Sequence, residues 1–92
     1  MSETLPYIVY VLLSDKDHQF YIGFTEDIEQ RFADHCAGRV ASTAPRRPLR
    51  LIHSEHYADK GDALRRELYL KTTKGKRALH LMLRDGVPRP TG

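Results

Sequence analysis

Short runs of apolar residues, separated by polar turns, organise this 92-residue chain. Tyr7 to Leu13 is nearly continuous in apolar residues and rich in residues that favour β-structure, which predicts a central strand. Residues 14–18 form a polar turn, and 19–23 return as a second strand, so the pattern predicts a β-hairpin. Residues 49–57 alternate in part, with Leu49, Leu51 and His53 on one side, and predict a third strand.

The segment after the hairpin has the features of an amphipathic helix. Thr25 is a suitable N-cap, and Gly38 marks the end of a helix that runs to about Ala37. Ile28, Phe32 and Cys36 recur every four residues, which predicts that they form the buried stripe. Arg31 and His35, also four apart, fall at the edge of that stripe.

Two more helices are predicted in the second half of the chain. One spans about 59–73, with Leu64 and Leu68 buried and Glu67 beside them, and Gly75 ends it. A short third helix covers residues 76–84. The order ββαβαα predicts an α+β fold in which helices flank a three-stranded, mostly antiparallel sheet. We expect one domain over residues 1–92, with a core of about 6–84 and a frayed tail at 85–92.

Composition limits the environment in which the protein works. The longest apolar run, Tyr7 to Leu13, is the length of a strand, so no membrane span is predicted. Residues 1–4 lack the basic start and apolar core of a signal peptide, and Cys36 is the only cysteine. These features favour a cytoplasmic protein without disulfides or a structural zinc site.

Charge is distributed unevenly between the two halves of the chain. Residues 1–45 carry three Lys/Arg and seven Asp/Glu, whereas residues 46–92 carry twelve and five, so the net charges are −4 and +7. The basic half could bind a polyanion such as nucleic acid. A solvated basic surface explains the same asymmetry. The residues that we expect to contact phosphates are Arg39, Arg46, Arg47, Arg50, Lys71, Lys74 and Lys76.

A spaced set of side chains supplies candidate chemistry. The set is Tyr10, Tyr21, Arg31, His35 and Glu67. An arginine can neutralise phosphoryl oxygens, a carboxylate can hold a metal ion, and a tyrosine or histidine can exchange protons with water. Each member has an ordinary alternative: Tyr10 and Tyr21 as core tyrosines, Arg31 with His35 as a solvated helix edge, and Glu67 as a partner of Lys71.

The order and spacing of these residues resemble the GIY-YIG nuclease superfamily. Ile8-Val9-Tyr10 occupies the first motif, with Ile in place of Gly and Val in place of Ile, and Tyr21-Ile22-Gly23 is an intact second motif. Arg31 follows Gly23 by eight residues, the spacing of the superfamily's catalytic arginine. The similarity covers about Tyr7 to Leu79 and is closest to the small stand-alone (YhbQ-like) branch.

The resemblance implies a metal-dependent endonuclease, a hydrolase of DNA or structured nucleic acid of the kind that serves DNA repair. It implies that Tyr10, Tyr21, Arg31, His35 and Glu67 are catalytic and that Glu67 binds one Mg²⁺ or Mn²⁺. It favours DNA over RNA as the substrate, and a protein partner could direct the domain to its target. Two alternatives remain: a nucleic-acid-binding module with little or no cleavage, and a protein-interaction domain.

Overall fold

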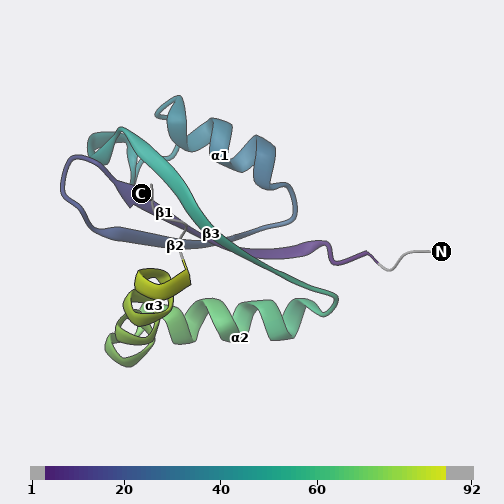
Figure 1. Ribbon diagram of the computed structural model, residues 1–92. Helices are drawn as coiled ribbons and strands as arrows, with labels where there is room; N and C mark the ends of the chain where they lie inside the picture. Colours follow the sequence, from purple (N-terminus) through teal and green to yellow (C-terminus); the bar gives the residue numbers. More distant parts are fainter. Residues whose placement is uncertain (1–3, 87–92) are drawn as a thin grey trace.

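The computed structural model describes residues 4–86 and confirms the predicted element order (Figure 1). Residues 1–3 and 87–92 lie outside the described part of the chain, so most of the predicted tail is not covered. The elements are β1 (Tyr7–Ser14), β2 (Phe20–Thr25), α1 (Ile28–Cys36), the 3₁₀ helix η1 (Ala44–Arg46), β3 (Leu49–Tyr57), α2 (Lys60–Lys71) and α3 (Thr73–Gly86).

The three strands form an antiparallel sheet in the order β2-β1-β3, with α1 on one face and α2 and α3 on the other (Figure 1). Successive residues of β1 point to opposite faces. Val9 and Val11 pack toward α2 and α3, while Tyr10 and Leu12 form a second core with residues of α1. Helices cover both faces, which is why β1 is apolar along nearly its whole length.

A β-bulge in β3 changes the predicted alternation of that strand. Val11 pairs with His53 but Leu12 pairs with Leu51, so Ile52 is an extra residue between them. A bulge shifts the side-chain alternation by one position. Leu51, predicted to lie on the same side as Leu49, is 39% exposed although Leu49 is buried, and Ile52 packs against the core shared with α2 and α3.

The buried face of α1 differs from the predicted stripe. Ile28 and Phe32 pack against the sheet as expected, but Cys36 is exposed and His35 is fully buried. A histidine can be buried here because both ring nitrogens have hydrogen-bond partners. The N-cap is Asp27, whose carboxylate accepts from the Gln30 backbone N–H, and not Thr25.

The inner face of α2 is also shifted. Leu64 and Leu68, predicted to be buried, are exposed, and Ala63 and Leu70 enter the core instead. Polar residues lie on the inner side because they have partners in the sheet: Arg66 donates two hydrogen bonds to Glu55 of β3. Although burial raises the pKa of Glu55, bonds from Arg66, His53 and Tyr57 lower it to about 2.

The junction between α2 and α3 depends on Gly75. The sequence pattern predicts that the second helix ends at this glycine, but α2 ends at Lys71 and Gly75 lies in the first turn of α3. A Cβ at Gly75 would be 1.9 Å from the carbonyl oxygen of Tyr69. The glycine therefore permits α3 to begin against the last turn of α2. α3 also begins earlier and ends later than the predicted 76–84.

Candidate active site

Tyr10 is the centre of the candidate site. It lies on β1, is fully buried and points toward α1. Its hydroxyl oxygen is 2.8 Å from Nε2 of His35 and accepts a hydrogen bond of 3.4 Å from Nε of Arg31. Because His35 and Arg31 are one turn apart on α1, a single helix supplies both contacts to the same oxygen.

The tyrosine ring fits at this position because β2 has a glycine opposite it. Tyr10 pairs with Gly23 in the strand register. A Cβ at Gly23 would be only 2.4 Å from both Cζ and the hydroxyl oxygen of Tyr10. The glycine of the Tyr-Ile-Gly motif thus leaves the space in which the Tyr10 ring lies.

Tyr21 and Thr43 complete the surroundings of His35. The Tyr21 ring lies 5.0 Å from the His35 ring, edge to face, and 6.3 Å from the Tyr10 ring. Nδ1 of His35 is 2.7 Å from Oγ1 of Thr43, which is fully buried. Burial, together with the positive charge of Arg31, lowers the pKa of His35, so its imidazole is neutral at neutral pH.

Electrostatics keep Tyr10 protonated in the free protein. Burial raises the pKa of Tyr10 above its usual value of 10.0, and the charges of Tyr21 and Glu67 add to that effect. The hydrogen bond from Arg31 opposes it. The same bond raises the pKa of Arg31, so the guanidinium is always charged. Any role of Tyr10 as a base therefore requires that substrate binding change its environment.

Glu67 lies apart from the other four predicted site residues. It lies on α2, on the sheet face opposite α1, and its side chain is 16% exposed. Its carboxylate forms an ion pair of 3.1 Å with Lys71. The negative charge of Glu67 contributes to the raised pKa of Tyr10. The structure therefore brings Tyr10, Tyr21, Arg31 and His35 into one cluster, whereas Glu67 lies on α2 and is paired with Lys71.

Glu67 supplies the one carboxylate among the predicted site residues. Residues 4–86 contain no group of three or more His, Cys, Asp or Glu side chains placed to hold a metal. Mg²⁺ usually keeps several waters and needs one or two carboxylates together with phosphate oxygens. The Glu67 carboxylate is mostly buried and is paired with the half-exposed Lys71, so an incoming ion would have to displace that lysine.

Most of the basic residues predicted to contact phosphates have protein partners. Arg39 pairs with Asp34, Arg50 with Asp15 and Lys71 with Glu67, while Arg47 donates to the Ala44 carbonyl. These residues are exposed apart from their contacts. Lys74 and Lys76 are exposed near the start of α3 and have no ion pair among the residues that the structure describes.

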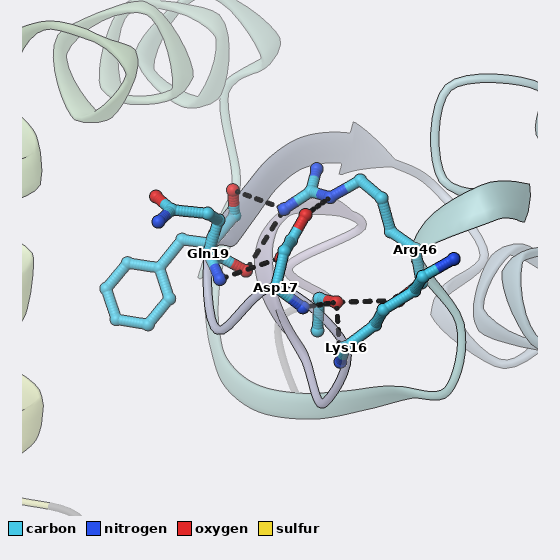
Figure 2. Close-up of polar contacts among 6 residues, drawn as sticks. Lys16, Asp17, Gln19 and Arg46 are labelled. Carbon is cyan, nitrogen blue, oxygen red and sulfur yellow. Dashed lines mark hydrogen bonds and ion pairs between the residues drawn. The ribbon is translucent and has the colours of Figure 1, made fainter.

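Arg46 joins the loop before β3 to the hairpin turn, as Figure 2 shows. Its guanidinium donates to the Asp17 carboxylate and to the carbonyls of Gln19 and Phe20, at 2.9, 3.1 and 3.3 Å. The Ser14 hydroxyl donates to the carbonyl of Arg46 at 2.6 Å. These contacts favour a structural role for Arg46 over the predicted contact with phosphate. They also fix the loop that places Thr43 beside His35.

Thr43 is the member of the cluster that sequence analysis missed. It lies in a stretch of small residues, 41–44, where no periodicity or spacing distinguishes it from its neighbours. Its place beside His35 depends on how the loop is folded back against the hairpin. That arrangement is a tertiary property, and a single sequence carries no signal for it.

Comparisons with known proteins find relatives over most of the chain. Residues 6–80 match the family described as the GIY-YIG catalytic domain. A UPF0213 protein of Lacticaseibacillus paracasei is 48% identical over 69 residues, covering 74% of this chain and 76% of the relative. The UPF0213 protein YazA of Bacillus subtilis is 36% identical over 81 residues, covering 86% and 81%.

A solved structure extends the comparison to the fold. The solution NMR structure of a UPF0213 protein from Bacillus halodurans has a TM-score of 0.54 and 30% identity, and the match covers 87% of this chain and 86% of that one. Within residues 4–86, no helix has the length and apolar character needed to cross a membrane.

Proposed function

The chain belongs to the GIY-YIG family, whose fold is of the nuclease type. On that basis we propose that it hydrolyses phosphodiester bonds in DNA or structured nucleic acid with the help of one divalent metal ion. The observation that carries the proposal is the contact of Arg31 and His35 with one buried tyrosine oxygen, that of Tyr10. A fixed cation beside proton-exchanging groups suits attack on a phosphodiester.

Arg31 is the residue that we assign to the phosphate. Its side chain is partly exposed, although Nε is directed at Tyr10. A guanidinium presents several N–H donors in a fork that matches phosphoryl oxygens. The bond to Tyr10 is long, at 3.4 Å, so a bound phosphate can draw Arg31 away from it at little cost.

Tyr10 is the residue that we assign to the attacking water. The free protein buries it completely, so Arg31 would have to move toward a phosphate to admit a water molecule to the Tyr10 oxygen. Tyr21 and His35 fix the ring of Tyr10 and the direction of its hydroxyl. Glu67 would hold Mg²⁺ or Mn²⁺, and the bound ion would stabilise negative charge on the leaving oxygen.

A nucleic-acid-binding module without cleavage is the second candidate. Two observations favour it: Tyr10 has no exposed surface, and Glu67 is paired with Lys71. Both features block chemistry unless substrate rearranges the side chains. The exposed basic residues would bind phosphates under either proposal.

A cleavage panel tests the proposed function. Single-stranded, nicked, flapped and duplex DNA, and the matching RNAs, are incubated with the protein and either Mg²⁺ or Mn²⁺. We expect at least one substrate to be cut, and we expect chelation of the metal to stop the reaction, because the leaving oxygen loses its stabilising charge. Binding without cutting on every substrate with both metals would favour the second candidate.

Replacing both Lys74 and Lys76 by alanine is expected to weaken nucleic-acid binding without changing the fold. These exposed lysines would release counterions when they meet phosphates, so the slope of log affinity against log salt should fall by about one for each phosphate that is no longer neutralised. Fluorescence anisotropy at several salt concentrations measures this slope. The control removes the same charge elsewhere, at the exposed residues Lys16 and Lys60. An equal decrease in the two double variants would contradict a local binding surface.

A further inference from the structure

The buried side chain of Thr43 has no role in the chemistry described above, yet it lies against the candidate site. Its Oγ1 is 2.7 Å from Nδ1 of His35, and the other ring nitrogen of His35 faces Tyr10 at 2.8 Å. A neutral imidazole carries one proton, on either Nδ1 or Nε2. Because both nitrogens have a partner, the position of that proton sets which group donates in each hydrogen bond between Tyr10, His35 and Thr43.

One arrangement satisfies every donor. Protons are donated in sequence from Arg31 to Tyr10, from Tyr10 to Nε2 of His35, from Nδ1 of His35 to Thr43, and from Thr43 to the Val40 carbonyl. The last bond is long, at 3.5 Å. Each group still has an acceptor for its proton, and aligned bonds of this kind strengthen one another.

The reverse arrangement leaves a buried donor without an acceptor. If Thr43 donates to Nδ1, then Nε2 donates to Tyr10, whose oxygen already accepts from Arg31. Among the described residues, the hydroxyl proton of Tyr10 then has no acceptor, although this residue is fully buried. An unpaired buried hydroxyl costs more than the long bond between Thr43 and Val40 yields.

We propose that Thr43 is a positioning residue that holds His35 in the Nδ1–H tautomer, so that the free electron pair of Nε2 faces the Tyr10 hydroxyl. The inference deepens the proposed function, on which it rests. It gives the Tyr10 proton a destination inside the protein. As Tyr10 takes a proton from the attacking water, its own O–H bond breaks and an Nε2–H bond forms on His35. His35 becomes an imidazolium, and its Nδ1–H remains hydrogen-bonded to Oγ1 of Thr43.

Nitrogen-15 NMR of the histidine rings tests the tautomer directly. Long-range proton–nitrogen spectra distinguish a protonated ring nitrogen from an unprotonated one, and a His35→Gln variant assigns the signal among the five histidines. In the wild type we expect Nδ1 to be protonated and Nε2 to be unprotonated. A wild-type spectrum with the proton on Nε2 would overturn the proposal, whether or not the protein cuts nucleic acid.

Three substitutions of Thr43 distinguish a role in positioning the His35 proton from a role in packing alone. Thr43→Val keeps the shape but removes the acceptor, so the His35 proton should move toward Nε2 and cleavage should fall by at least about tenfold. Thr43→Ser keeps the hydroxyl and should restore both the tautomer and most of the rate. Thr43→Ala gives the same readout if the valine does not fold. A valine or alanine variant that retains the Nδ1–H tautomer would remove Thr43 from this role.

The two proposals fail in different ways. If no substrate is cut but the ring nitrogens respond to Thr43 as described, the positioning role stands and the nuclease proposal fails. If the wild type cuts while its His35 carries the proton on Nε2, the nuclease proposal stands and the role of Thr43 is wrong.

Discussion

Glu67→Gln is expected to lower the cleavage rate by about 10³-fold, the scale on which the loss of one group that stabilises transition-state charge acts. The amide keeps the shape of the side chain but is a much poorer ligand for Mg²⁺. Nucleic-acid affinity should stay constant or rise slightly, because a negative charge is removed from a basic stretch of α2. Single-turnover cleavage and anisotropy with the same substrate measure the two effects.

Folding stability should hardly change in this variant. The ion pair that Glu67 loses has a half-exposed lysine as its partner, Lys71, and such a pair contributes about 0.5 kcal/mol or less. Glu26→Gln is the control, since it removes the same charge from an exposed position before α1. If Glu67→Gln cuts as fast as the control, Glu67 has no part in the reaction.

Gly23→Ala is expected to damage both the site and the fold. The added methyl group would lie 2.4 Å from two atoms of Tyr10, whose ring is buried and hydrogen-bonded and so cannot move aside freely. Overpacking of this kind typically costs about 1–3 kcal/mol. A shift of the tyrosine by about 1 Å would in addition lower the rate by about 10²-fold.

The control for Gly23→Ala is the same substitution at Gly61. A methyl group there would lie 3.0 Å from the carboxylate oxygen of the N-cap Asp59, a much smaller overlap, and alanine favours a helix by about 1 kcal/mol relative to glycine. Urea unfolding should therefore show a much larger decrease in midpoint for Gly23→Ala than for Gly61→Ala. A Gly23→Ala protein with wild-type midpoint and rate would show that Tyr10 need not occupy its present position.

The order of strands and helices was predictable from sequence because short segments of the chain specify each element. The continuous apolar run of β1 and the polar turn after it define the hairpin, and Gly38 follows the end of α1 at a φ of +82°. What periodicity could not identify was which stripe of each helix faces the sheet. His35 is buried because both of its ring nitrogens have hydrogen-bond partners on other elements, which the spacing of apolar residues does not reveal.

The candidate site was predictable only in part. For Tyr10, the structural interpretation and the functional one describe the same side chain. Tyr10 is a core tyrosine and a member of the polar cluster at once. Arg31 lies at the helix edge as expected, but His35 does not. Glu67 pairs with Lys71, as its ordinary alternative predicted, and lies on the other face of the sheet from α1. These combinations depend on contacts between elements, which spacing along one chain cannot specify.

The bonds of Arg46 to the hairpin turn bear on how the sequence of this protein can change. Hairpin turns are usually the places where a small domain best tolerates added or deleted residues. Here the turn supplies the acceptors that hold the loop of Thr43, through Asp17 and the Gln19 carbonyl. A change of turn length would therefore alter the position of a side chain that touches His35, which makes this turn a poor site for a tag or a graft.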